Sequence, residues 1–134
     1  MPYGHPPNGN KVWVLAMKVL LVEDEAIIAM NFEEVLGQAG YEVLGPASTV
    51  LQAKTLINKH DDIDCAVLDV NLRGEPAYPI AELLNMKGVP FIFTSGYGKD
   101  GIDQKFSDRP VLSKPVDEEL LCSLIAQLLK RASA

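Results

Sequence analysis

Short apolar runs alternate with helical patterns from Lys18 onward, and this alternation is the feature that most constrains the fold. Each run is three to six residues long, which suits a buried parallel strand better than a helix. The five predicted strands are Lys18–Val22, Tyr41–Leu44, Ala66–Leu68, Val89–Thr94 and Val111–Ser113.

The segments between these runs show the apolar spacing of helices. The first helix is expected to stop at Gly40, and Ser48 or Thr49 can cap the second. Gly45-Pro46 is expected to end the second strand. The predicted helices are Glu25–Ala39, one that carries Leu51, Leu56 and Ile57, Pro76–Met86, Ile102–Phe106 and Asp117–Arg131. The pattern predicts an α/β fold with a five-stranded parallel sheet and helices on both faces.

Composition narrows the class of protein. A chain of 134 residues suits one domain, and its net charge of −6 argues against direct nucleic-acid partners. No apolar run approaches the roughly 20 residues that span a bilayer, and the N-terminus lacks a signal-peptide pattern. Cys65 and Cys122 lie in apolar segments and are expected to be buried, reduced thiols. We therefore expect a cytoplasmic protein with no membrane association.

The start of the chain differs from the rest. Its first ten residues are rich in Pro, Gly and Asn, which is typical of a flexible tail. Residues 11–16 either extend a strand or belong to this tail. We expect residues 1–16 to form a flexible N-terminal tail and residues 17–134 to form the domain.

Polar side chains follow four of the five predicted strands. Glu23-Asp24 follow the first, Asp69 the third, Thr94-Ser95-Gly96 the fourth and Lys114-Pro115 the fifth. Ligand sites of parallel sheets lie at the carboxyl ends of the strands, so these residues are expected to share one rim. Each acidic residue alone is more often a solvated loop residue. The coincidence of four compatible strand ends is what favours a functional site.

Three carboxylates in one place repel each other unless a cation intervenes. Mg²⁺ prefers oxygen ligands and retains some of its waters, which suits such a rim. A hard cation beside a carboxylate nucleophile is typical of phosphoryl transfer, with Lys114 and a hydroxyl available for the phosphoryl oxygens. The sequence therefore predicts a magnesium-dependent phosphoryl site.

Four motifs in order resemble the receiver domains of two-component response regulators. They are VLLVEDE (19–25), VLDVNLRGE (67–75), PFIFTSGYG (90–98) and LSKP (112–115), and the resemblance covers about residues 17–131. The resemblance implies a flavodoxin-like (βα)5 fold with strand order 2-1-3-4-5. The stretch FTSGYG is similar to a subgroup, often stand-alone, with a Phe-Ala-Thr-Gly-Tyr-like motif.

The resemblance also assigns roles. Asp69 matches the phospho-acceptor and Lys114 the lysine that pairs with the phosphoryl oxygens. The Mg²⁺ ligands would be Glu23 (largely through water), Asp24, Asp69 and the backbone carbonyl of Asn71. A cis peptide bond between Lys114 and Pro115 is also implied, and it is compatible with proline.

Two features need comparison with the family pattern: the identity of the switch hydroxyl and the residue at position 111. Thr94 and Ser95 point to opposite faces of a strand, so one of them aims at the site. Counting from Pro90 favours Ser95 as the switch hydroxyl. Many receivers carry an aromatic residue three positions before the lysine, but this chain has Val111. Tyr97 is then either a mobile aromatic or a surface loop residue.

The resemblance implies phosphoryl acceptance from a histidine kinase or phosphotransfer protein, followed by binding of a downstream protein target. Phosphorylation and dephosphorylation would be self-catalysed, so the domain is not classed as a metabolic enzyme. It is expected to be a monomer or a weak homodimer. The alternatives are a receiver excised from a hybrid kinase or longer regulator, an Asp-nucleophile phosphatase, and a degenerate receiver that only binds. Asn71 stands where such phosphatases carry a second Asp, which disfavours turnover.

Overall fold

The computed structural model describes residues 3–4 and 14–132, and its centre is a five-stranded parallel sheet. The sheet has the order β4-β3-β5-β8-β9, which confirms the predicted order 2-1-3-4-5 of the five strands. All four strand pairs are parallel. The strands are β3 (Lys18–Val22), β4 (Glu42–Ala47), β5 (Cys65–Asp69), β8 (Phe91–Ser95) and β9 (Val111–Ser113).

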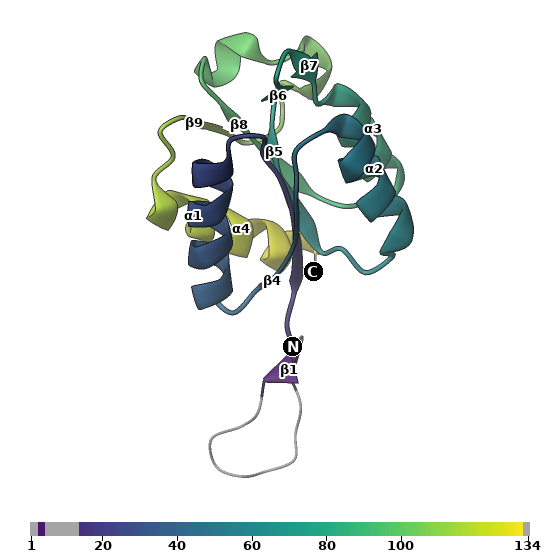
Figure 1. The fold of residues 1–134 in the computed structure, drawn as a ribbon, viewed down its shortest axis with the longest axis vertical. Coiled ribbons are helices and arrows are strands. Elements are labelled where there is room, and N and C mark those ends of the chain that lie inside the picture. The colour runs from purple at the N-terminus through teal and green to yellow at the C-terminus, as the bar shows by residue number, and fades with distance from the viewer. Residues whose placement is uncertain (1–2, 5–13, 133–134) are drawn as a thin grey trace.

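Four α-helices among the described residues cover the sheet in two layers. In Figure 1, α1 and α4 lie on one side of the sheet, and α2 and α3 lie on the other. Their bounds are α1 (Ala26–Gln38), α2 (Val50–Lys59), α3 (Tyr78–Met86) and α4 (Glu118–Ala132). Thr49 caps α2, because its side chain accepts a hydrogen bond from the amide of Gln52.

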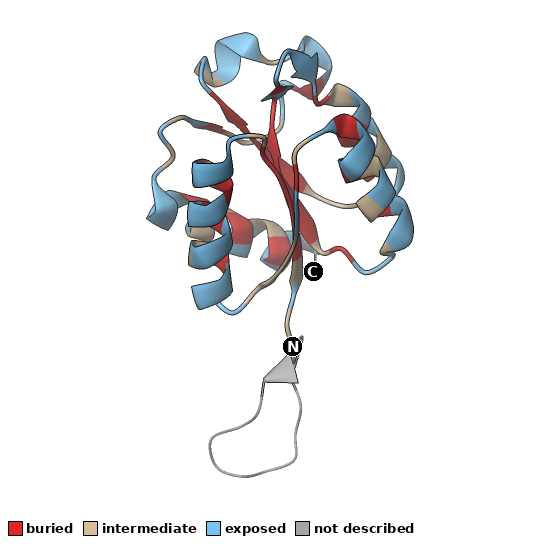
Figure 2. Ribbon diagram, in the orientation of Figure 1, coloured by how far each residue is buried: buried red, intermediate tan, exposed pale blue. Residues whose placement is uncertain are grey.

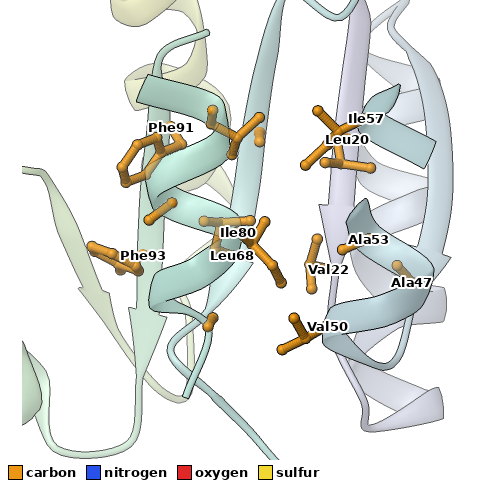
Figure 3. Packing of buried hydrophobic residues seen from close by; sticks show 14 of the residues in the cluster. Leu20, Val22, Ala47, Val50, Ala53, Ile57, Leu68, Ile80, Phe91 and Phe93 are labelled. Carbon is orange, nitrogen blue, oxygen red and sulfur yellow. The ribbon is translucent and has the colours of Figure 1, made fainter. Parts of the chain in front are cut away.

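The central strands are buried on both faces, as Figure 2 shows by their colour. Two separate apolar clusters result, one on each face. The α2/α3 cluster, drawn in Figure 3, joins strand residues such as Leu68 and Phe93 to Ile57 of α2 and Ile80 of α3. This burial explains why the strands are continuous apolar runs rather than alternating ones.

The second strand does not end at Gly45-Pro46 as predicted, because β4 continues to Ala47. The register between β3 and β4 shifts at this point. Gly45 takes a φ of +103°, and a Cβ there would lie 2.6 Å from the Leu21 carbonyl oxygen. The strand therefore passes through an irregularity that glycine permits, and pairing resumes when Glu23 N–H bonds to Ala47 O at 2.9 Å.

The predicted helix Ile102–Phe106 is also wrong. Two 3-10 turns, η1 (Gly98–Gly101) and η2 (Gln104–Phe106), stand in its place. The side chain of Asp103 accepts a hydrogen bond from the Lys105 amide and starts η2 as a separate turn. The two turns therefore connect β8 to β9 without an α-helix.

The third helix begins two residues later than predicted. Residues before it form a small antiparallel pair, β6 (Asn71–Leu72) with β7 (Glu75–Pro76), directly after β5. The amide of Ala77 bonds to Val70 O, which folds this loop back onto the end of β5.

Most of the predicted tail, residues 1–16, lies outside the described residues. Within it, β1 (Tyr3–Gly4) pairs antiparallel with β2 (Val14–Leu15). Cys65 and Cys122 are free thiols, buried and half-buried respectively, and burial raises the pKa of Cys65 to about 12. Among the described residues, no helix is long and apolar enough to cross a membrane.

Candidate phosphoryl-acceptor site

Asp69 is the last residue of β5 and is almost fully buried at the carboxyl end of the sheet. Its Oδ1 accepts a hydrogen bond from the amide of Asn71 at 3.2 Å, and its Oδ2 accepts one from Lys114 Nζ at 2.9 Å. Both carboxylate oxygens are therefore oriented from two different loops. Asp69 also lines a hollow of about 280 Å³, together with Asp24, Lys114, Gly96 and other residues of the surrounding loops.

Three carboxylates meet at this rim, as the strand ends predict. Oxygens of Glu23, Asp24 and Asp69 all lie within 4.8 Å of one another. Glu23 is fixed on both sides, since its amide bonds to Ala47 O and its Oε2 accepts the Glu25 amide at 3.0 Å. Such a set of hard oxygen donors is what a divalent cation such as Mg²⁺ requires.

The electrostatics of Glu23 agree with that requirement. Burial raises the pKa of Glu23 to about 7, the Glu25 amide opposes this, and the neighbouring Asp69 carboxylate adds to it. Glu23 Oε1 is buried without a hydrogen-bond partner in the described part of the chain, although the Lys114 ammonium lies 3.1 Å away as an ion pair. A buried carboxylate oxygen with unused lone pairs beside two further carboxylates fits a bound cation.

Lys114 follows β9 and reaches across the end of β8, which lies between β9 and β5. Its ammonium lies 2.9 Å from Asp69 and 3.7 Å from Glu25, and its peptide bond with Pro115 is cis, as predicted. Burial works against its charge, but the carboxylates of Asp69 and Glu23 raise the pKa of Lys114 above its usual value. Lys114 therefore stays charged at neutral pH.

Thr94 and Ser95 occupy different environments at the end of β8. Ser95 is fully buried, and its Oγ accepts a hydrogen bond from the Tyr97 amide at 3.1 Å. Thr94 pairs with Asp69 in the sheet register, and its hydroxyl is buried without a hydrogen-bond partner among the described residues. Ser95 thus stands at the junction of the sheet with the loop that follows it.

One residue near the site, Arg73, was missed at the sequence level. Arg73, in the loop after β5, takes a φ of +53° and places its Nε 3.6 Å from Asp24 Oδ2. The Asn71 side chain bonds within the same loop, since its Oδ1 accepts the Gly74 amide at 2.7 Å, and its backbone carbonyl stays the predicted metal ligand. The only sequence signal for Arg73 is a basic residue in the loop that directly follows the acceptor strand.

Fold and rim together define a class: a doubly wound α/β domain with an acidic cluster and one lysine at the strand ends. The model of the response regulator receiver domain matches residues 19–126, and the chain belongs to this family, which acts in two-component signalling. The predicted resemblance is thereby confirmed.

Individual relatives agree with the family. The solution structure of SdrG from Sphingomonas melonis Fr1 is 40% identical and covers 85% of this chain and 97% of its own, with a TM-score of 0.75. The receiver domain of the hybrid histidine kinase CckA is 25% identical and covers 84% of this chain and 98% of its own, with a TM-score of 0.68. The regulatory protein PdtaR from Mycobacterium tuberculosis is 26% identical over 81% of this chain and 53% of its own. The chain spans about half the length of the curated relatives it matches first.

Proposed function

We propose that this protein is a phospho-aspartate switch in which Asp69 accepts a phosphoryl group from a phosphohistidine. The donor would be a histidine kinase or a phosphotransfer protein. The observation that carries the proposal is the buried Asp69 carboxylate, held between the Lys114 ammonium and the two acidic residues that follow β3. Structural similarity to the BeF3-activated conformation of SdrG, with a TM-score of 0.72, supports a receiver that responds at this carboxylate.

The chemistry needs little covalent participation beyond Asp69 itself. One Asp69 oxygen attacks phosphorus, the P–N bond to the donor imidazole breaks, and that nitrogen takes up a proton. Lys114, already 2.9 Å from Asp69, offsets charge on the phosphoryl oxygens. Glu23, Asp24, Asp69 and the Asn71 carbonyl would hold Mg²⁺, which supplies further charge neutralisation when bound.

The output is a change of shape rather than a released product. Ser95 would turn its hydroxyl toward the phosphoryl group while the glycine-containing loop after β8 rearranges and alters a protein-binding surface. Dephosphorylation would be self-catalysed. We expect the domain, residues 17–134, to act in the cytoplasm as a monomer or weak homodimer on a downstream protein target, without direct nucleic-acid contact.

Mass spectrometry tests the acceptor. The purified protein incubated with acetyl phosphate and Mg²⁺ should gain the mass of one phosphoryl group, and the gain should disappear with EDTA. Asp69→Asn should abolish it, whereas Asp100→Asn, an exposed control in η1, should not. Saturable labelling of Asp69→Asn would rule out Asp69 as the acceptor, and multiple-turnover hydrolysis of phosphate esters would instead favour the phosphatase alternative.

A further inference from the structure

A switch needs a side chain that transmits the change at Asp69 to the protein surface. Position 111, three residues before Lys114, holds a half-buried valine that cannot carry a hydroxyl or a ring. Tyr97 is largely exposed and makes no ring contact with the described aromatic cluster. Another aromatic, Tyr78 at the start of α3, lines the same hollow as Tyr97 and Gly101.

Tyr78 makes two hydrogen bonds to that loop through a single oxygen. Its hydroxyl donates to the carbonyl of Gly101 at 3.1 Å and accepts the amide of Asp103 at 2.7 Å. Gly101 ends η1, and Asp103 precedes η2. The Tyr78 hydroxyl thus joins both turns to α3, although 23 to 25 residues separate it from them in the chain.

The ring of Tyr78 is held independently of its hydroxyl. It stacks on Phe106 with centroids 5.5 Å apart and an interplanar angle of 8°, and it meets Phe93 edge-on at 6.2 Å. Phe93 belongs to β8 and Phe106 to η2, so the ring position is fixed by the core. A change in the two hydrogen bonds therefore leaves the ring in place.

Gly101 also lies close to the predicted switch hydroxyl of Ser95. A Cβ on Gly101 would lie 3.6 Å from Ser95 Oγ and 3.4 Å from Tyr97 Cβ. Gly101 is thus near Ser95 Oγ and also bonded through its carbonyl to the Tyr78 hydroxyl. A hollow of about 270 Å³, lined by acceptor-loop residues together with Tyr78, Tyr97 and Gly101, gives this loop room to move.

We propose that the Tyr78 hydroxyl is a latch that holds residues 96–103 in the resting position. This inference rests on the proposed function of Asp69. When Ser95 turns toward a phosphorylated Asp69, its contact with Gly101 and Tyr97 changes, and the two bonds to Tyr78 open. The latch gives this receiver a route from the acceptor to α3 and the η1–η2 surface that needs no aromatic residue at position 111.

Tyr78→Phe tests the latch because it removes both hydrogen bonds and keeps the stacked ring. Tyr41→Phe is the matched control, since Tyr41 packs against the cluster on the other face of the sheet. The probe is BeF3−, a tetrahedral analogue of a phosphoryl group, with Mg²⁺. Loss of the latch makes the resting loop less favourable, so the dissociation constant for BeF3− should fall about fivefold in Tyr78→Phe. The control should match the wild type.

Hydrogen exchange gives a second measurement, and its comparison of Tyr78→Phe with the wild type needs no ligand. The Asp103 amide should exchange about tenfold faster in Tyr78→Phe, while the Arg109 amide, which bonds to Phe106 O, should not change. In the wild type, BeF3− should likewise reduce protection at Asp103. This last measurement holds even if the variant fails to fold.

The outcomes separate the two proposals. A wild type that binds no BeF3− contradicts the acceptor function, whatever Tyr78 does to exchange at Asp103. A wild type that binds BeF3− with unchanged protection at Asp103, or a folded Tyr78→Phe with unaltered affinity, overturns the latch. Weaker BeF3− binding by Tyr78→Phe also overturns it, because the hydroxyl would then stabilise the active form.

Discussion

The acceptor cluster (Glu23, Asp24, Asp69 and Lys114) and the switch segment (residues 96–106) lie at the same end of the sheet but are built differently. The members of the acceptor cluster end a strand or follow one within two residues, and backbone hydrogen bonds to a neighbouring strand position two of them, Glu23 to Ala47 and Lys114 to Ser95. In the switch segment only Phe106 is buried, and the backbone of the segment forms two 3-10 turns. The comparison indicates a fixed chemical site beside a loop that few contacts restrain, which is the arrangement that a switch requires.

The largest expected effect concerns the one buried anchor of the switch segment. Phe106 is 1% exposed and contacts the rings of Phe91, Phe93 and Tyr78. Phe106→Ala should lower the free energy of unfolding by about 3–4 kcal/mol, since it removes a ring from a packed core. Urea denaturation measures this, with Ile102→Ala, at a half-buried position, as a milder control. A cost below that of the control would show that the switch segment is anchored elsewhere.

The next effect is the contribution of the Glu23 charge in the acceptor cluster to the pH dependence of stability. Because burial raises the pKa of Glu23 to about 7 from 4.5, its stabilising contribution is complete below about pH 4.5 and is lost as pH rises through about 7. The metal-free protein should therefore lose about 3 kcal/mol of stability across this window, and Glu23→Gln should remove most of that loss.

Denaturation series at several pH values, with EDTA and with Mg²⁺, measure this dependence. Mg²⁺ should flatten the wild-type profile, because a cation favours the ionised carboxylate. Glu34→Gln, at an exposed position on α1, is the control and should leave the profile unchanged. A Glu23→Gln profile as steep as the wild type would mean that another group in the cluster carries the dependence.

A smaller effect tests how the switch segment turns. Gly98 has a φ of +57°, and a Cβ there would lie 3.2 Å from Ser113 Oγ, whereas Gly101 has no such φ and would make only ordinary contacts. Gly98→Ala should cost about 1 kcal/mol, and Gly101→Ala should be nearly neutral. Thermal unfolding compares the pair. Equal costs would show that the two glycines serve the same purpose.

The same contrast explains what the sequence predicts well. The bounds of β3 and β9 match their predictions because a charged residue ends each run: Glu23 follows β3, and Lys114 follows β9. Since Glu23 and Asp24 come just after β3 and Asp69 ends β5, the parallel sheet brings the three carboxylates together as predicted. Sequence patterns therefore predict the position of a residue well where the hydrogen bonds between strands fix that position.

The failures lie where tertiary contacts decide. Ile102 and Phe106 have helical spacing, but the Asp103 side chain and the burial of Phe106 produce separate turns. Gly45-Pro46 reads as a strand end, yet β4 is an edge strand that tolerates a register shift. The contacts of Arg73 and Tyr78 are with partners 23 to 49 residues away, so a local pattern cannot predict these partners.

The smallest effect tests whether the charge of Arg73, which lies outside both regions, weakens metal binding at the acceptor cluster. Arg73 is largely exposed, and its guanidinium lies 3.6 Å from the carboxylate of Asp24. It therefore competes with a metal ion for Asp24, and Arg73→Gln should raise Mg²⁺ affinity about twofold to threefold without a measurable change in stability. The control is Lys105→Gln, which removes an exposed ion pair between Lys105 of the switch segment and Glu82 of α3. Titration of Mg²⁺ at fixed ionic strength measures both, because screening weakens such exposed pairs. If Arg73→Gln instead binds Mg²⁺ more weakly, Arg73 orients Asp24 rather than competing for it, and the loop after β5 is part of the acceptor cluster.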